Sequence, residues 1–252
     1  MNKLWLFGDS YADPVRLPGL KYHDESYPRY YHIVKDFYNY DLVNTGLGGC
    51  SNEYIMDQFL QNVEHIKEND IVLFLPTWHG RRWIFEDLPK LTTYFSYIKY
   101  LKKVYADRDI TEEEKLKCEQ TFLDVVCPFE RNKSENYIQM MLSTVSDYKT
   151  KIGFTGLIIN TFKTEHVSRN DNLINSTGFL HEISNKEFTD LKNFHEKYIE
   201  YRDFRSNHLT PQNHRLFGKK IIESIETGKD LDLTSGFLSN IIEEKDIEEH
   251  YN

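Results

Sequence analysis

The stretch Asp-Ile-Val-Leu-Phe-Leu at residues 70–75 is a short apolar run bounded by Asn69 and Pro76. An apolar run of this length without alternation is typical of a strand buried on both faces, as in the centre of a parallel sheet. Similar short runs occur at residues 3–7, 41–44 and 152–160. Because neighbouring parallel strands are joined by crossovers, usually helices, this feature predicts a chain in which helices alternate with strands.

Three segments with helical periodicity lie between or after these runs. Residues 26–39 predict a helix with Ser26 as its N-cap, and residues 52–66 predict a second helix. Residues 211–227 predict a third helix, which starts near Pro211, ends at Gly228 and carries His214 on its surface. The side chains expected to face the core are Tyr30, Ile33, Val34 and Phe37 in the first helix; Ile55, Met56, Phe59, Leu60, Val63 and Ile66 in the second; and Leu216, Phe217, Ile221, Ile222 and Ile225 in the third.

This alternation predicts a single α/β domain over residues 1–228, with helices on both faces of a parallel sheet. Residues 81–150 interrupt the pattern and are interpreted as a helical insertion or cap, in which Thr111 and Glu114 form a capping box. Residues 163–180 are expected to form a loop. The acidic segment 229–252 is interpreted as a tail that docks on the domain or on a second subunit, which leaves a homo-oligomer open.

Charge and composition exclude several classes of protein. The 252 residues carry a net charge of −9 and no basic stripe, so nucleic acid is not an expected partner. No apolar run reaches the roughly 18 residues of a membrane-spanning helix. Residues 1–7 are too short for the apolar region of a signal peptide, so a cytoplasmic or virion-associated location is expected. The cysteines Cys50, Cys118 and Cys127 lack metal-binding spacing and are interpreted as free thiols.

Three polar segments follow the ends of predicted strands: Gly-Asp-Ser at 8–10, Thr-Gly-Leu-Gly-Gly at 45–49 and Pro-Thr-Trp-His-Gly-Arg-Arg at 76–82. Ligands of parallel α/β sheets bind beyond the carboxyl ends of the strands, so these segments are expected to meet at one edge. A serine hydroxyl there needs a neighbouring base to become a nucleophile. His208, in the segment Asn-His-Leu-Thr-Pro before the last long helix, is the candidate base.

The Gly-Asp-Ser block, the glycine loop after the second strand and the His-Leu-Thr-Pro block together resemble the SGNH (GDSL-type) hydrolase family. The resemblance implies a three-layer α/β/α, flavodoxin-like domain that hydrolyses acyl esters, often on carbohydrates or lipids, without a metal or cofactor. It implies that Ser10 is the nucleophile and His208 the base. It further implies that the N–H groups of Ser10 and Gly49 stabilise the oxyanion, with Gly48 as the second candidate glycine, while Asp9 shapes the turn.

The family's third block, Gly-x-Asn-Asp, does not follow the strand at 70–75. Thr77, His79 or Arg81 is expected to supply the missing oxyanion donor or to contact the substrate, and an arginine suits an acidic substrate. Asn52 is a further candidate donor, although it is also expected to cap the helix that starts there. Trp78 is a candidate for stacking on a sugar; packing in the core or cap is the alternative.

The family pattern Asp-x-x-His would place an aspartate at position 205, where this chain has Arg205. Asp203 is therefore the candidate acid that orients His208. The competing interpretation is a loop salt bridge from Asp203 to Arg202 or Arg205.

The expected function is a serine esterase of SGNH type, acting on a small acyl ester such as an O-acetyl group on a carbohydrate. The alternative is a catalytically weak or inactive binding or structural protein on the same fold, for example in a viral particle. The missing asparagine block and the displaced aspartate favour that alternative. A third hypothesis makes residues 81–150 a surface for binding a partner.

Overall fold

The computed structural model describes residues 1–14, 27–77, 111, 113, 127–162, 169–190, 205 and 208–251, with the backbone alone for 127–135, 247 and 249–251. Within these residues, one six-stranded sheet has the order β2-β1-β3-β4-β5-β6, and all its strand pairs are parallel. The strands are β1 (Lys3–Phe7), β2 (Asp41–Asn44), β3 (Ile71–Phe74), β4 (Thr155–Ile158), β5 (Ile174–Thr177) and β6 (Leu231–Asp232). The α/β class with a parallel sheet flanked by helices is therefore confirmed.

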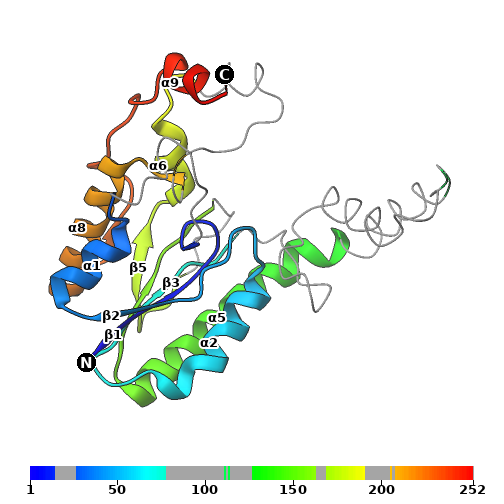
Figure 1. Ribbon diagram of the computed structural model, residues 1–252. Helices are drawn as coiled ribbons and strands as arrows, with labels where there is room; N and C mark the ends of the chain where they lie inside the picture. Colours follow the sequence, from blue (N-terminus) through cyan, green and yellow to red (C-terminus); the bar gives the residue numbers. More distant parts are fainter. Residues whose placement is uncertain are drawn as a thin grey trace.

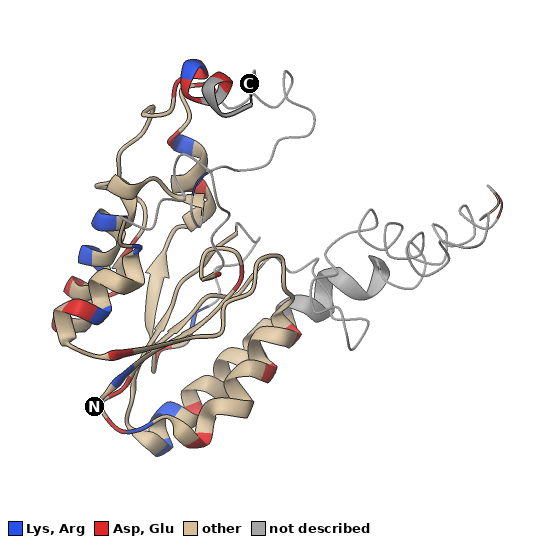
Figure 2. Ribbon diagram, viewed as in Figure 1, with Lys and Arg blue, Asp and Glu red and all other residues tan. Residues whose placement is uncertain are grey.

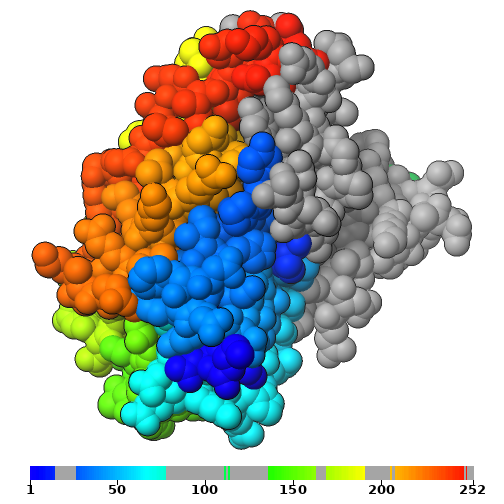
Figure 3. Space-filling view, turned by 60° about the vertical axis from the view of Figure 1, so that its left-hand side comes forward, coloured from blue at the N-terminus to red at the C-terminus, as the bar shows by residue number. Residues whose placement is uncertain are grey.

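Helices cover both faces of this sheet (Figure 1). On one face, α1 (Tyr30–Tyr38) and α8 (Pro211–Thr227) lie side by side, as Figure 3 also shows. On the other face lie α2 (Asn52–Asn62), which continues as a short 3-10 turn (Val63–His65), and α5 (Cys127–Ile152). The shorter helices α6 (Leu180–Lys186) and α9 (Glu244–Tyr251) lie toward the carboxyl ends of the strands.

Two apolar cores follow from this arrangement. Alternate residues of β1 point to opposite faces, so Leu4 and Leu6 join the core under α1 and α8, and Trp5 and Phe7 join the core under α2 and α5. β3 is buried along its whole length, as its apolar run predicts. The central strands are therefore fixed from both sides, and the loops at their carboxyl ends start from a rigid base.

Asp70 sets the register between β1 and β3. Its carboxylate accepts hydrogen bonds from the Lys3 N–H at 2.8 Å, the Trp5 Nε1–H at 2.8 Å and the Lys67 N–H at 3.0 Å. This residue is 1 % exposed, so the charge is satisfied by donors rather than by water. The contacts align the start of both strands and thereby place the turn that follows β1.

Helix α8 matches its prediction closely. Thr210 is the N-cap and accepts from the Asn213 N–H, Pro211 occupies the first turn, and Gly228 ends the helix with φ of +66°. The expected position of His214 on the surface is wrong: the ring is 2 % exposed and stacks on Tyr30 at 5.9 Å between centroids. The close packing of α1 on α8 buries it.

Helix α1 begins at Tyr30 with Arg29 as its N-cap, so the predicted start at Ser26 is wrong. Pro28 explains the late start, because a proline disfavours helical backbone at the residue before it. Phe37 is 59 % exposed and Leu60 is 45 % exposed, contrary to their predicted burial. In α1 the face that meets the core includes Tyr31 instead.

Three segments differ from their predicted roles. The last part of the expected insertion belongs to α5, whose Met141, Leu142 and Val145 pack into the core between sheet and helices. Residues 163–180, expected as a loop, contribute β5 and the start of α6. The expected tail contains β6, and the Leu233 N–H donates to the Thr177 carbonyl at 2.9 Å, so this segment docks on the domain.

The proposed capping box at Thr111 involves Glu114, which lies outside the described residues.

Acidic and basic residues are interspersed along the described helices, and the ribbon in Figure 2 shows no continuous basic stretch in them. None of the helices in the described ranges combines the length and the apolar character that crossing a membrane requires.

Candidate active site

Asp9 organises the turn that carries Ser10. Its side chain is fully buried, and its Oδ1 accepts a hydrogen bond from the Tyr11 N–H at 3.1 Å. Its carbonyl accepts from the N–H groups of Ala12 and Asp13, both at 2.9 Å. The expected role of Asp9 in shaping this turn is confirmed, and the turn directs Ser10 beyond the carboxyl end of β1.

The hydroxyl of Ser10 is shielded from solvent and has no hydrogen-bond partner among the described residues. Buried polar groups in native proteins are nearly always paired, and exceptions are found at catalytic sites or where a water or ligand completes the pair. The hydrogen-bonding capacity of Ser10 Oγ is therefore not used by any described residue. Ser10 Oγ is also not hydrogen-bonded to His208 in this structure.

The glycine loop at 45–50 lies directly against this turn. The Leu47 N–H donates to the Gly8 carbonyl at 3.1 Å, and the Asn44 amide donates to the Ala12 carbonyl at 2.8 Å. A Cβ placed on Gly48 would lie 3.9 Å from the Ser10 Cβ. The structure thus brings the first two of the three polar segments together at one edge of the sheet.

Most N–H groups of these two loops are already engaged. Gly48 donates to Asp13 Oδ2 at 2.6 Å, and Cys50 donates to the Leu47 carbonyl at 3.1 Å. Within the described residues, the N–H groups of Ser10 and Gly49 make no hydrogen bond. Of the two candidate glycines, Gly49 is thus the one with a donor to offer, and its φ of +77° suits glycine.

Thr77 and Asn52 are used inside the protein. The Thr77 N–H donates to Asn52 Oδ1 at 2.8 Å, and Asn52 Nδ2 donates to the Thr77 carbonyl at 3.1 Å. The Thr77 hydroxyl donates to Asp9 Oδ2 at 2.7 Å. These contacts join the ends of β1 and β3 to the start of α2. Asn52 does not cap that helix, because Ser51 is the N-cap and accepts from the Tyr54 N–H at 3.3 Å.

His208 reaches the same edge from the other end of the chain. Its ring lies 5.0 Å from the ring of Tyr11, the residue after Ser10, measured between centroids. Its backbone has φ of +60°, in the left-handed region that residues other than glycine rarely adopt. The distance to Tyr11 places the imidazole beside the turn that carries the candidate nucleophile.

His181 and Phe162 extend this aromatic group. Phe162 packs on Tyr11 at 6.0 Å and on His181 at 5.3 Å between centroids. Burial lowers the pKa of His181, and the nearby charges of His208 and Arg205 lower it further. A second imidazole that favours its neutral form therefore lies close to the candidate base.

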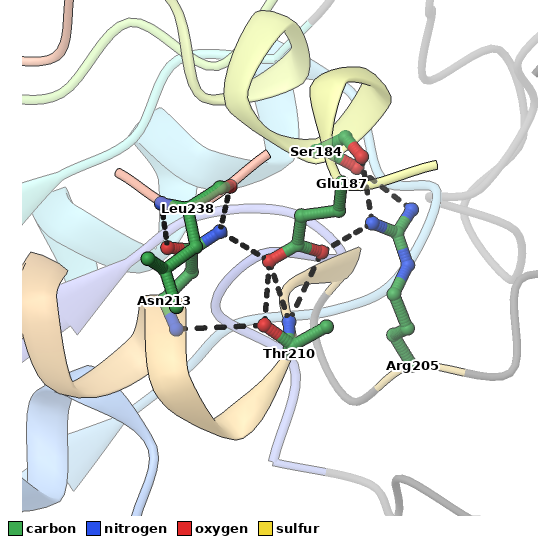
Figure 4. Close-up of polar contacts among 6 residues, drawn as sticks. All are labelled: Ser184, Glu187, Arg205, Thr210, Asn213 and Leu238. Atoms are coloured by element: carbon green, nitrogen blue, oxygen red, sulfur yellow. Dashed lines mark hydrogen bonds and ion pairs between the residues drawn. The ribbon is translucent and has the colours of Figure 1, made fainter. Parts of the chain in front are cut away.

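Arg205 lies at the position where the resemblance expects an aspartate, and as a cation it cannot act as that acid. Its side chain is 1 % exposed and forms a buried ion pair with Glu187, with Arg205 Nη1 at 2.5 Å from Glu187 Oε2 (Figure 4). Asp203, the candidate acid, lies outside the described residues, as do Trp78, His79 and Arg81. Their roles remain predictions.

Four residues near the candidate site have no role predicted from the sequence: Tyr11, Phe162, His181 and Glu187. Phe162 follows β4 at the same edge of the sheet, and its place after a predicted strand was a usable signal. His181 and Glu187 lie in and just after α6, which the sequence did not predict, so no signal pointed to them. In the part of the chain that the structure describes, no three His, Cys, Asp or Glu side chains gather as a metal site requires.

A scan against protein-family models gives no match to the chain, and a search among curated proteins gives no significant relative.

Proposed function

We propose that the protein is a serine esterase of SGNH type, with Ser10 as nucleophile and His208 as general base. The strand order supports this proposal, because the arrangement 2-1-3-4-5 is that of flavodoxin-like folds, which bind ligands where β1 and β3 meet. Ser10 follows β1 at this point of the sheet.

One observation carries the proposal: among the described residues, the Ser10 hydroxyl is buried without a hydrogen-bond partner, next to two N–H groups that no described residue engages and near an imidazole. Ser10 and Gly49 are partly exposed, so these donors are accessible to a ligand or to water. An acyl-transfer site needs them for the substrate, since an oxyanion hole consists of donors directed at a charge that forms during the reaction.

The reaction follows from these groups. Ser10 Oγ attacks the acyl carbonyl carbon while His208 takes the hydroxyl proton, and the carbonyl oxygen becomes an oxyanion held by the N–H groups of Ser10 and Gly49. The ester bond breaks as His208 returns the proton to the leaving alcohol. Water then attacks the acyl-enzyme with His208 again as base, which releases the carboxylic acid and restores Ser10.

Ser10 Oγ makes no hydrogen bond to His208 in this structure, and such bonds often form only in the substrate complex. A small acyl group, such as the acetyl of an O-acetylated carbohydrate, is the substrate we infer. The rings of Tyr11 and Phe162 provide an apolar wall beside the nucleophile.

A binding or structural protein on the same fold is the second candidate. The observation that favours it is the buried Glu187–Arg205 pair, which occupies the position where the resemblance expects an acid. Such a protein has no reason to keep an activated serine.

The test is hydrolysis of p-nitrophenyl acetate, together with labelling by a fluorophosphonate, in the wild type, Ser10→Ala and His208→Ala. We expect labelling at Ser10 in the wild type and a loss of turnover of roughly 10³-fold or more in each variant. Wild-type turnover no higher than that of the variants, with no label on Ser10, would favour the binding protein.

A further inference from the structure

The buried carboxylate of Glu187 is the centre of a hydrogen-bond network (Figure 4). This network holds residues on both sides of His208 in the chain. The Glu187 oxygens accept hydrogen bonds from the Thr210 N–H at 3.0 and 3.1 Å and from the Thr210 hydroxyl at 2.7 Å. They also accept from Asn213 Nδ2 at 2.6 Å and from Arg205 Nη1 at 2.5 Å. Glu187 is fully buried, so these donors replace water completely.

The donors lie on both sides of His208 in the chain. Arg205 precedes the histidine and is also tied to α6, because its guanidinium donates to the Ser184 carbonyl at 2.7 Å and to Ser184 Oγ at 2.9 Å. Thr210 follows the histidine and caps α8. One carboxylate therefore fixes the chain just before and just after the candidate base.

His208 itself has an unfavourable backbone conformation. Its φ of +60° persists in a non-glycine residue only when the surroundings hold it, and such outliers cluster at functional sites. The His208 N–H approaches the Arg205 carbonyl at 3.5 Å, so the strained residue is also linked to the backbone of the anchored Arg205.

We propose that Glu187 is a positioning residue that holds the His208 imidazole beside Ser10 by fixing both ends of its loop. This inference rests on the proposed esterase function. It assigns the orientation of the base to a carboxylate on a different element, acting through the backbone, in a chain that has Arg205 at the expected acid position.

The charge of Glu187 is essential to this role. The Arg205 guanidinium is 1 % exposed, and a buried cation needs a counter-charge. In Glu187→Gln the side-chain amide meets donors on three sides with a single oxygen, so the network loses acceptors and the Arg205 anchor is released. The double variant Glu187→Gln/Arg205→Met removes both charges and keeps an acceptor for Thr210, which protects folding while still releasing that anchor.

The test observes the His208 ring directly by NMR in protein that contains isotope-labelled histidine. The His208 signals are assigned as those missing from the spectrum of His208→Ala. We expect shifted or doubled His208 signals in both Glu187 variants, and slower fluorophosphonate labelling of Ser10 by about tenfold or more. Val145→Ala is the matched control, because Val145 is 1 % exposed in the core on the other face of the sheet. It should lower the melting temperature and leave the His208 signals unchanged.

Two outcomes overturn the positioning role: His208 signals that are the same in the wild type and both Glu187 variants, or signals that change equally in Val145→Ala. The esterase proposal fails separately. If wild-type Ser10 is not labelled, that proposal is lost, and the His208 spectra still decide whether Glu187 positions the ring.

Discussion

The contact between Gly46 and Ala12 determines how closely the glycine loop approaches the turn that carries Ser10. A Cβ on Gly46 would lie 2.6 Å from the backbone carbon of Ala12, 2.6 Å from its Cβ and 2.8 Å from its carbonyl oxygen. Gly46→Ala therefore forces two backbone segments apart, since no flexible side chain can move away. We expect this variant to be less stable and less reactive at Ser10.

The magnitude follows from the geometry. Carbon atoms in contact lie about 3.5–4.0 Å apart, so the loops must separate by roughly 1 Å. Overpacking costs about 1–3 kcal/mol, and the backbone on both sides places this site in the upper half of that range. A loss of about 2–3 kcal/mol lowers the melting temperature by roughly 4–12 °C in a domain of this size. A displacement of about 1 Å in a catalytic group reduces the rate by about 10²-fold.

The assay compares thermal unfolding with the rate of fluorophosphonate labelling at Ser10. Gly228→Ala is the control, because Gly228 has φ of +66° and open space around an added Cβ. Its cost is the left-handed backbone alone, about 1 kcal/mol, far from the candidate site. The control should lower the melting temperature by roughly 2–4 °C and label at the wild-type rate.

If Gly46→Ala melts and labels like the wild type, the Gly46–Ala12 contact does not set the spacing of the two loops. The same conclusion follows if Gly228→Ala loses labelling in proportion to its lost stability, because reactivity would then report stability rather than loop spacing.

Two further predictions concern buried polar groups. Thr77→Val removes the 2.7 Å hydrogen bond from the Thr77 hydroxyl to Asp9. The free energy of unfolding should fall by about 1.5–3 kcal/mol. A urea midpoint and an m-value that both equal those of the wild type would contradict this. His181 has a lowered pKa when folded, mainly through burial and then through His208, so the unfolded chain binds its proton more readily. Stability should therefore fall as the pH drops from about 6.5 through the lower folded pKa, and His181→Gln should flatten this part of the melting-temperature profile. Equal profiles in the two proteins would remove His181 as a source of the effect.

Much of the sheet was predictable because its strands are marked by apolar runs and its helices by periodicity. β3 and α8 carry the clearest signals, namely a continuous buried run in the first and a proline start with a glycine end in the second. β5 was not predictable on these grounds. Its Asn175 and Ser176 are buried polar residues. Ser176 Oγ accepts from the Asn160 N–H, while the Asn175 side chain accepts from the Asn170 N–H and donates to the Asn170 carbonyl, and no apolar pattern marks these positions.

The candidate site likewise contains residues whose place could be predicted from the sequence and residues whose place could not. Ser10 and Gly49 follow predicted strands, so the topology of a parallel sheet alone brought their loops to one edge. The internal roles of Thr77 and Asn52 depend on a reciprocal pairing across the fold, which sequence spacing does not reveal. The place of Glu187 depends on α6, and polar residues of such a short helix resemble those of a loop.

The late position of β6 in the chain has a consequence for synthesis. β1 is made first and becomes an inner strand, whereas β6 supplies the partner of β5 only when residues 231–232 have left the ribosome. Until then the outer edge of β5 is open, and open edges template pairing with other chains. The nascent domain therefore exposes an edge that can pair with other chains until β6 is added. His208 reaches the turn that carries Ser10 only in this late stage of translation, because it follows β1 to β5 in the chain.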